Sequence, residues 1–528
     1  MKYEVEKKYL VLPTSPWASM KSVRLSTANG ECIFDVSIRL DYESPQRDVC
    51  LDMERFMGMS LELTVSPEAH IEIKQKDRKP IERFRQPLRP HYHFTSPEGW
   101  INDPNGMVYS EGLYHLFYQL NPCDTSWGNM HWGHATSKNL VDWEHLPIAL
   151  FPDKTGAMFS GSGIADVNNL SGLKTGERTP ILLFYTAAGS CSKASDGAKF
   201  TQCVAVSTDG GEAFVKSLAN PVIDHIEGEN RDPKVVYSDS LGLYVMSLYL
   251  GEDRYLILTS ENLTQWKRVC EKSIPGDNEC PAFFPMKNAK GEEKWILMGA
   301  RDRYLVGTFD GNGFTPEREA PYVFNYTPER NVYAAQKFEN TGERNIRMAW
   351  LKTKFAPYGM PFNGAMSFPQ EMELVSVDGS DRIAVKPARE IEKLHSKKIK
   401  ISYDGKEYAE PLKGIAQDII LTIDSGRATK AEISLFGKTF AADFANGALT
   451  SGEYAFPIQK GSDGRFGIRL LTDTCGIEIY TSDGKAYGVL TDIPDANLCV
   501  LKVSADEDIK IRGEAFRMRK ARFFDKRK

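Results

Sequence analysis

Three carboxylic acids in this chain stand one or two positions before a proline that opens an apolar segment. They lie in the segments Asn102-Asp103-Pro104, Arg231-Asp232-Pro233 and Glu279-Cys280-Pro281. When several carboxylic acids share a pocket, burial and mutual repulsion keep one of them protonated while the others stay ionised. A protonated acid and an ionised carboxylate on either side of a glycosidic bond can cleave it. The alternative for each acid alone is an ordinary surface turn, where Asp before Pro is common.

The separation of two such acids would determine the stereochemical course of the reaction. Carboxyl groups about 5–5.5 Å apart allow one acid to attack the sugar directly and retain its configuration. A gap of about 6.5–9.5 Å leaves room for a water molecule and gives inversion.

The elements that would position these acids belong to an internal repeat. Four times, a short strand leads into a Ser/Thr-Asp/Asn turn and then an aromatic residue, at 133–143, 204–214, 256–266 and 305–314. A pair of apolar strands precedes each copy, at 106–119, 161–186, 233–250 and 281–300, and a fifth pair covers 332–352. Strands joined by turns, without helical patterns, predict an all-β fold with a five-bladed β-propeller over residues 89–380. A β-sandwich or barrel is the alternative, because Asp-Gly and Asn-Gly turns occur in any antiparallel fold.

In a propeller, the first strand of each blade lines the central channel. Asp103, Asp232 and Glu279 stand where three of these first strands begin. We therefore expect the three acids to meet at one end of the channel, although they are far apart in the sequence.

The segments on either side of the repeat have a different composition. Residues 1–88 contain alternating apolar runs such as 32–38 and 61–65 and end in a charged stretch, 74–85, which predicts a small N-terminal β-domain followed by a linker. Strand patterns at 470–480 and 509–511 predict a C-terminal β-sandwich over residues 388–528.

Composition excludes several classes of function. The formal net charge is -5, and the only basic run is the short stretch 517–528, so nucleic acid is not an expected partner. No segment approaches the roughly 18 apolar residues of a membrane span. The beginning of the chain has no signal-peptide core, which predicts a cytoplasmic protein, or a periplasmic or secreted one if the chain is a processed form. The nine Cys include no C-x-x-C pair, which fits reduced thiols.

Several segments resemble the conserved blocks of glycoside hydrolase family 32, the invertases, inulinases and levanases. The segment 100–106, Trp-Ile-Asn-Asp-Pro-Asn-Gly, is similar to the family's W-M-N-D-P-N-G signature. Segments 117–122, 127–134, 159–162, 231–235 and 279–281 look like further blocks in the family's order, and 473–484 looks like an element of its C-terminal sandwich. The resemblance runs from about residue 90 to the end, and the first 88 residues lie outside it.

The resemblance implies a retaining hydrolase of β-fructofuranosidic bonds in sucrose, inulin or levan. It implies that Asp103 is the nucleophile, Asp232 the transition-state stabiliser and Glu279 the general acid/base. The same resemblance implies a fructosyl-binding pocket lined by Asn102, Gln119, Trp127, Trp132, Ser160 and Arg231.

The residues themselves fit this pocket. Arg231 beside Asp232 could keep that acid ionised, and Trp rings could pack against sugar carbons. Packing inside a blade is the alternative for both Trp residues.

The sequence leaves the substrate and several alternative functions open. Ile101, Ala282 and Gln370 depart from the residues common in the family, which leaves the choice of fructoside undecided. A fructosyltransferase, an inverting arabinan- or xylan-cleaving propeller enzyme and a non-catalytic fructan-binding protein are the alternative functions. No metal is expected, because His131 and His134, three positions apart on a strand, would point to opposite faces. No cofactor is expected, because the sequence has no phosphate-cradling glycine loop between a strand and a helix.

Overall fold

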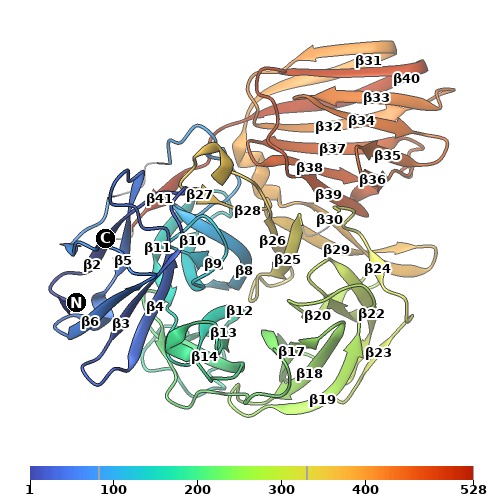
Figure 1. Cartoon of the computed structure of the whole chain (residues 1–528). Helices are drawn as coiled ribbons and strands as arrows, with labels where there is room; N and C mark the ends of the chain where they lie inside the picture. The colour runs from blue at the N-terminus through green and yellow to red at the C-terminus, as the bar shows by residue number, and fades with distance from the viewer. Residues whose placement is uncertain (81–83, 329–330, 527–528) are drawn as a thin grey trace.

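Five antiparallel sheets form a ring in the computed structural model, which describes residues 1–80, 84–328 and 331–526 (Figure 1). Each sheet has four principal strands that follow one another in the sequence. Blade 1 consists of β8 (Gly99–Ser110), β9 (Leu113–Asn121), β10 (His131–Ser137) and β11 (Trp143–Leu150). Blade 2 consists of β12 (Ala157–Ala165), β13 (Ile181–Ala188), β14 (Thr201–Ser207) and β15 (Val215–Lys216). Blade 3 consists of β16 (Arg231–Ser238), β17 (Leu243–Gly251), β18 (Arg254–Ser260) and β19 (Lys267–Ser273).

Blades 4 and 5 complete the ring. Blade 4 consists of β20 (Ala282–Lys287), β21 (Glu293–Met298), β22 (Arg303–Phe309) and β23 (Phe314–Pro316), and the short β24 (Tyr322–Val323) also pairs with β22. Blade 5 consists of β25 (Val332–Lys337), β26 (Ile346–Leu351), β29 (Gln370–Val377) and β30 (Ser380–Pro387). The segment 362–366 joins blade 5 to blade 1, because β27 (Phe362–Asn363) pairs with β8 and β28 (Ala365–Met366) pairs with β26. The predicted five-bladed propeller is confirmed.

The blades pack face to face, so their middle strands are buried on both sides. In blade 3, for example, β17 is an almost continuous apolar run whose interior residues are all buried. The first strands contact one another around the centre: β12 contacts both β8 and β16, and β16 also contacts β20. The beginnings of these first strands therefore converge at one end of the ring.

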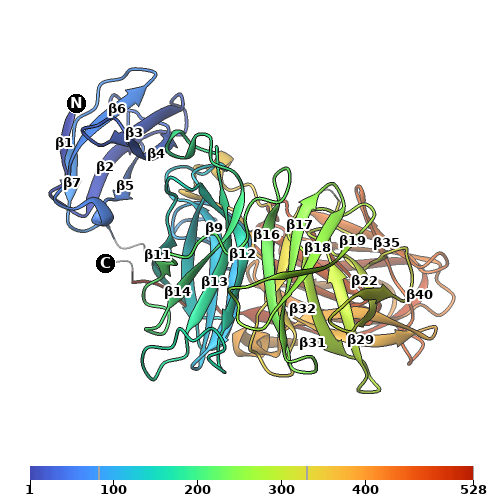
Figure 2. The ribbon, with the colours of Figure 1, turned by 90° about the horizontal axis from the view of Figure 1, so that it is seen from below.

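Two small sheets, here called the N-terminal sheets, precede the ring. One has the order β1 (Lys2–Glu4), β6 (Ser60–Ser66), β3 (Lys21–Ser26), β4 (Cys32–Ile38), and the other the order β5 (Arg47–Asp52), β2 (Tyr9–Thr14), β7 (Lys74–Lys76), with the short helix η1 (Glu54–Phe56). Alternating side chains of β3 and β4 are buried in a common core that also takes in Cys123 from the propeller. Figure 2 shows these sheets beside blade 1, projecting past one end of the ring.

The C-terminal part is a β-sandwich built from one continuous ladder of strands. Its strands are β31 (His395–Pro411), β32 (Gln417–Asp424), β33 (Lys430–Leu435), β34 (Lys438–Asp443), β35 (Ala448–Ser451), β36 (Tyr454–Pro457), β37 (Phe466–Asp473), β38 (Gly476–Thr481), β39 (Ala486–Leu490) and β40 (Val500–Met518). The long β40 pairs with β33 through its first half and with β32 through its second, so one strand serves both layers. The predicted sandwich is confirmed.

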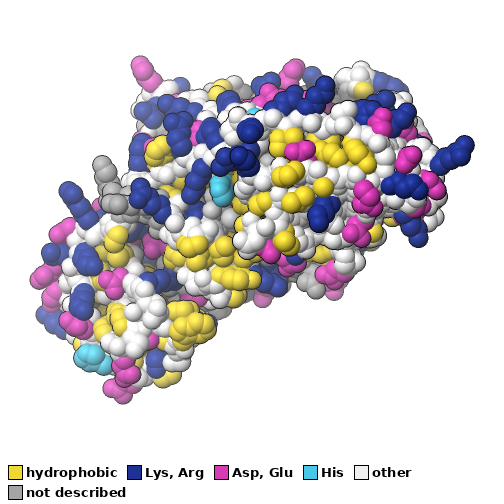
Figure 3. Space-filling view, turned by 90° about the horizontal axis from the view of Figure 1, so that it is seen from above, with side chains coloured by type: hydrophobic (Ala, Val, Ile, Leu, Met, Phe, Trp, Pro, Cys, Tyr) yellow, Lys and Arg dark blue, Asp and Glu magenta, His cyan; other side chains and the backbone are white. Residues whose placement is uncertain are grey.

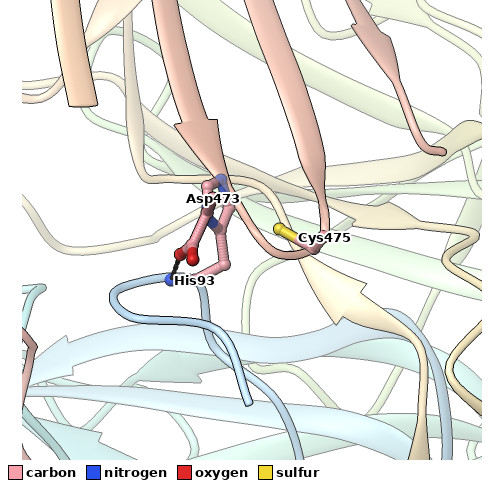
Figure 4. A group of neighbouring side chains, drawn as sticks. All are labelled: His93, Asp473 and Cys475. Atoms are coloured by element: carbon pink, nitrogen blue, oxygen red, sulfur yellow. Dashed lines mark hydrogen bonds and ion pairs between the residues drawn. The ribbon is translucent and has the colours of Figure 1, made fainter. Parts of the chain in front are cut away.

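A buried polar network joins the sandwich to the propeller. The Asp473 carboxylate accepts hydrogen bonds from the backbone N–H groups of His91, Tyr92 and His93, and it lies 3.0 Å from Nδ1 of His93 (Figure 4). His93, Asp473 and Cys475 bring potential metal-ligand atoms within 4.8 Å of one another. Both ring nitrogens of His93 are nevertheless taken up, one by Asp473 and the other by Glu478 at 2.9 Å. The cluster therefore connects two parts of the fold.

The chain finally returns from the sandwich to blade 1. There β41 (Phe523–Asp525) pairs in parallel with β11, and Asp142, just before β11, accepts a hydrogen bond from the backbone N–H of Arg522. Short helices η2 (Lys193–Ser195), η3 (Ala356–Tyr358), η4 (Arg389–Leu394) and η5 (Ser482–Gly484) lie in the connections. The domain limits 1–88, 89–380 and 388–528 stay a prediction, and β30 runs on to Pro387 while β41 joins the ring.

The molecule is elongated, with the N-terminal sheets at one end and the sandwich at the other (Figures 1 and 2). Figure 3 shows Lys and Arg side chains interspersed with Asp and Glu over the visible face. Within the described ranges, no helix has the length and apolar character that crossing a membrane requires.

Candidate active site

At one end of the ring, the first strands open onto a cavity of about 460 Å³, here called the active-site pocket. Asp103 from β8, Asp232 from β16 and Glu279 from the turn before β20 all line it. The structure therefore brings the three acids of the sequence motifs together in one pocket.

Local irregularities in the strands aim these acids into the pocket. The pairing of β8 with β9 shifts register between Ile101 and Pro104, and the pairing of β16 with β17 shifts between Arg231 and Lys234. A proline cannot donate a ladder hydrogen bond, and a bulge next to it turns the preceding side chain out of the sheet. Asp232 and Glu279 also have positive φ angles, 65° and 56°, of the kind that concentrates at functional sites.

Cys280 connects two of the acids. Its backbone N–H donates to Oδ2 of Asp232 at 3.0 Å, and its thiol lies 3.4 Å from Oδ2 of Asp103 and 3.6 Å from Oδ2 of Asp232. Burial and the neighbouring carboxylates raise the pKa of this thiol well above its ordinary value, so it stays protonated and acts as a donor. Asp103 and Asp232 thus face the same sulfur atom.

The surroundings of Asp103 have opposing effects on the pKa of its carboxyl. Burial raises the pKa of this carboxyl, and the charge of Glu279 raises it further. Hydrogen bonds from Ser160 and Asn102 lower the pKa because they stabilise the ionised form, and the Ser160 hydroxyl lies 2.6 Å from Oδ2. Asp103 is therefore a partly desolvated carboxylate held in place by a few donors.

The pKa of Asp232 differs from the expectation that Arg231 would keep this acid ionised. Burial raises the pKa of Asp232 to about 7, although the charge of Arg231 acts in the opposite direction. The guanidinium Nε is 3.8 Å from Oδ2 of Asp232, whereas its Nη2 donates to Oε1 of Glu279 at 2.8 Å. The nearer partner of Arg231 is thus Glu279.

Glu279 is held by partners from two other blades. Arg231 of blade 3 contacts one carboxylate oxygen, and the Tyr333 hydroxyl of blade 5 donates to the other. The same hydroxyl lies 3.0 Å from Oδ1 of Asn278. Glu279 is about one-fifth exposed, so solvent reaches it more easily than it reaches Asp232.

Five of the six predicted sugar-binding residues line the active-site pocket. These are Asn102, Gln119, Trp127, Ser160 and Arg231. Gln119 is oriented by donating from Nε2 to the Met158 carbonyl at 2.9 Å, and Asn102 accepts from the indole of Trp100 at 2.9 Å. Trp127 is 59% exposed, so a ligand in the pocket can contact its side chain.

Trp132 is the exception, and its placement corrects the sequence-based expectation. This residue belongs to β10, the third strand from the channel, and its side chain is fully buried between blades 1 and 2. Its indole N–H donates to the Phe159 carbonyl at 3.1 Å, and its ring contacts Phe117 and Tyr185. Trp132 therefore packs the blade interior, the alternative considered for it.

The two histidines that could suggest a metal are packing residues. His134 stacks on Phe117 with ring centroids 4.1 Å apart, and its Nε2 lies 3.2 Å from Nδ1 of His115. His131 has Nδ1 2.5 Å from the Asn129 carbonyl. Burial lowers the pKa of His131 to about 3 and that of His134 well below its usual value, so both rings are neutral at pH 7.

Sequence reasoning missed several residues of the pocket. Cys280 was part of a motif but received no role, and Trp100, Tyr333, Trp350 and Lys352 were not singled out. A signal for Tyr333 was present: it is the second residue of β25, the first strand of blade 5, as Asp232 is the second residue of β16 in blade 3. The repeat thus places a functional side chain at the same point of another blade.

Comparisons with known proteins agree with the fold and the pocket. The family model described as glycosyl hydrolases family 32 N-terminal domain matches residues 93–387. The levanase of Bacillus subtilis (strain 168) is 32% identical over 484 residues, which cover 81% of this chain and 70% of the levanase. The extracellular exo-inulinase of Aspergillus awamori is 31% identical and covers 72% of this chain and 78% of the relative.

A solved structure is similar over most of its length. The crystal structure of the Aspergillus awamori exo-inulinase superposes with a TM-score of 0.75 at 24% identity and covers 83% of this chain and 99% of the inulinase chain. At that identity the likeness concerns the fold. The family match begins at residue 93, so β1 to β7 lie outside it.

Proposed function

This chain belongs to glycoside hydrolase family 32, and from that premise we propose that it cleaves β-fructofuranosidic bonds with Asp103 as nucleophile, Glu279 as general acid/base and Asp232 as stabilising acid. The relatives are named as a levanase and an exo-inulinase, which supports a fructan or sucrose as the substrate. The observation that carries the assignment is the meeting of Asp103, Asp232 and Glu279 at the beginnings of three blades.

In the first step of the proposed reaction, the Asp103 carboxylate attacks the anomeric carbon, C2, of the fructosyl unit. The bond from C2 to the glycosidic oxygen breaks, and Glu279 donates its proton to that oxygen as the leaving sugar departs. The product of this step is a fructosyl ester of Asp103, with Glu279 now ionised.

In the second step, Glu279 takes a proton from a water molecule, whose oxygen attacks C2 and displaces Asp103. This step restores both carboxyl groups to their initial states, and the two displacements retain the configuration at C2. The contacts of Arg231 and Tyr333 stabilise Glu279 in the ionised form that this step begins from.

Asp232 has a role in binding rather than in bond exchange. Its carboxyl is nearly buried and close to Asp103 through the Cys280 thiol, so it is placed to bind hydroxyl groups of the fructosyl ring. Hydrogen bonds that strengthen as positive charge develops on the ring lower the barrier of both steps.

The first experiment measures sugar release from sucrose, inulin and levan by the Asp103→Asn and Glu279→Gln variants. A general acid/base contributes about 10²–10⁴-fold to rate, so Glu279→Gln should lower kcat by that factor, and Asp103→Asn should lower it at least as much. Asp310→Asn, in an exposed turn of blade 4, is the matched control and should retain wild-type kcat. Undiminished release by the Asp103→Asn variant would overturn the assignment of the nucleophile.

A second experiment separates the two roles. With an activated fructoside, whose leaving group departs without a proton from Glu279, Glu279→Ala can still form the fructosyl ester. Added azide can attack that ester without a general base, so a fructosyl azide with retained configuration should form. Asp103→Ala cannot form the ester, so it should form no fructosyl azide of retained configuration. An adduct of inverted configuration from Glu279→Ala would contradict a covalent intermediate.

A further inference from the structure

A second cavity, here called the rim cavity, adjoins the active-site pocket. It has a volume of about 350 Å³ and shares Trp127, Met130 and Phe159 with the active-site pocket. Its opposite wall includes Met20, Asp35 and Ser37 of the N-terminal sheets. A part of the chain outside the family match thus forms a surface that is continuous with the catalytic pocket.

Specific contacts fix this wall relative to the pocket. The Asn129 side chain forms two hydrogen bonds with the backbone of Ser37, accepting from its N–H at 2.8 Å and donating to its carbonyl at 2.7 Å. Asn129 lies two residues after Trp127, on the loop that both cavities share. On the other side, the Asp35 carboxylate accepts from the backbone N–H of Lys193 in blade 2 at 2.8 Å. The N-terminal sheets are therefore tied to two propeller loops around the rim cavity.

The chemistry of the rim cavity suits a sugar. The carboxylate of Asp35 and the hydroxyl groups of Ser37 and Ser192 can bind sugar hydroxyls, while Met20 and the exposed Trp127 ring offer apolar surface to sugar C–H groups. Its volume falls within the range of about 300–1,000 Å³ typical of small-molecule sites.

We propose that the rim cavity binds the sugar units that follow the cleaved bond in a fructan, so that the N-terminal sheets determine the preference for chain length. This inference rests on the proposed function. Asp232 is nearly buried in the active-site pocket, so the fructosyl unit to be transferred lies against the acids. The rest of a chain must then leave past the exposed rim, where Trp127 leads into the rim cavity.

The experiment compares kcat/KM for sucrose with kcat/KM for inulin-type and levan-type oligosaccharides of five or more units. Sucrose has one unit beyond the cleaved bond, whereas the oligosaccharides are long enough to enter the rim cavity. Ser37→Trp places bulk in this cavity and keeps the two Asn129 hydrogen bonds, which use only the Ser37 backbone. The ratio of kcat/KM for the oligosaccharide to kcat/KM for sucrose should fall at least fivefold.

Thr64→Trp is the matched control, because Thr64 is an exposed residue of β6 and takes no part in either cavity. It should leave the ratio within twofold of the wild-type value. If Ser37→Trp has a lowered melting temperature, Met20→Ala tests the same point, because it removes apolar surface from the rim cavity. It should raise KM for the oligosaccharides more than KM for sucrose. An unchanged ratio in all these variants, or an equal loss on sucrose and oligosaccharides, would overturn the inference.

The two proposals fail in different ways. A wild-type protein that releases no sugar from any fructoside contradicts the proposed function. A wild-type protein that is active on sucrose and fructans, with a ratio insensitive to Ser37→Trp, contradicts only the role of the rim cavity.

Discussion

Asp103 and Asp232 are the same type of side chain in one pocket, yet their surroundings differ. Asp103 accepts hydrogen bonds from the Ser160 hydroxyl and the Cys280 thiol, whereas Asp232 accepts them from the backbone N–H and the thiol of Cys280. Burial raises the pKa of both, and to about 7 for Asp232. At the scale of single residues, the type of donor distinguishes the proposed nucleophile from the proposed binding acid.

The hydrogen bond that the Ser160 hydroxyl donates to Asp103 should affect how kcat/KM depends on pH. Asp103, the proposed nucleophile, must be ionised to attack, so activity should be lost as pH falls through its pKa, which burial raises and the Ser160 hydrogen bond lowers. Ser160→Ala removes the lowering contribution, and the acid limb of kcat/KM against pH should move to higher pH. The measurement is a kcat/KM profile on sucrose over about pH 3–8.

Ser162→Ala is the control for this substitution. Ser162 lies on the same strand, β12, but its hydroxyl donates to the Pro233 carbonyl at 2.9 Å rather than to an acid. Its acid limb should coincide with that of the wild type. An acid limb of Ser160→Ala that stays in place or moves to lower pH would contradict the role given to Ser160.

Sequence patterns at this scale predicted the acids but not their partners. Asp103, Asp232 and Glu279 could be identified because a proline follows each at a similar point of the repeat. Tyr333 and Arg231 contact Glu279 from two other blades, and Asp232 has a positive φ angle. Contacts between blades and unusual backbone angles have no local signature in the sequence.

At the scale of single elements, the position of a strand in its blade decides what its residues do. Trp127 lies in the loop before β10, and Trp132 is the second residue of β10. The loop opens onto the pocket, whereas the strand is covered by its neighbours on both faces. Because the two Trp residues are only five positions apart, the sequence did not show where the loop ends and the buried strand begins.

Replacing each of the two Trp residues by Ala should therefore have different effects on stability and on substrate binding. Trp132→Ala leaves a large cavity in the blade and should lower the free energy of unfolding by about 3–5 kcal/mol. Trp127→Ala should change it by no more than about 0.5 kcal/mol and instead raise KM for fructosides, because its ring is exposed at the pocket. Urea unfolding and steady-state kinetics on both variants check this. Equal loss of stability in the two variants would contradict the placement of Trp132.

At the scale of the whole molecule, the propeller is the hub to which the other parts attach. The N-terminal sheets reach it through Asn129 and Asp35, and the sandwich reaches it through the network around Asp473. The sequence predicted the three parts from their strand patterns, but it did not predict these junctions. Asp473 was noticed only as part of a family element, and its partner His93 lies 380 positions away in the chain.

The Asp473 network should make a pH-dependent contribution to stability. Hydrogen bonds from His91 and His93 lower the pKa of Asp473 against the opposing effect of burial. A carboxyl with a lowered pKa stabilises the folded state above its unfolded pKa of about 3.9, and this contribution is lost as pH falls further. Asp473→Asn should thus reduce the free energy of unfolding by about 3–5 kcal/mol at pH 7. The reduction should be smaller at pH 3.

Urea unfolding at both pH values checks this prediction. Asp463→Asn, in an exposed turn of the sandwich, serves as the control and should leave the free energy of unfolding within about 0.5 kcal/mol of the wild type. A reduction for Asp473→Asn that is as large at pH 3 as at pH 7 would show that ionisation of Asp473 is not its cause.

The pairing of β41 with β11 bears on the order in which the molecule can be completed during synthesis. The backbone N–H of Arg522 reaches Asp142 across 380 positions of the chain. At a translation rate of about 5–20 residues per second, the ribosome needs on the order of tens of seconds to cover that distance. For that time the outer edge of blade 1 has no partner strand from β41, and an open strand edge can pair with another nascent chain. The first blade to be synthesised is therefore among the last to be finished, and crowding of polysomes should affect the yield of this protein through that edge.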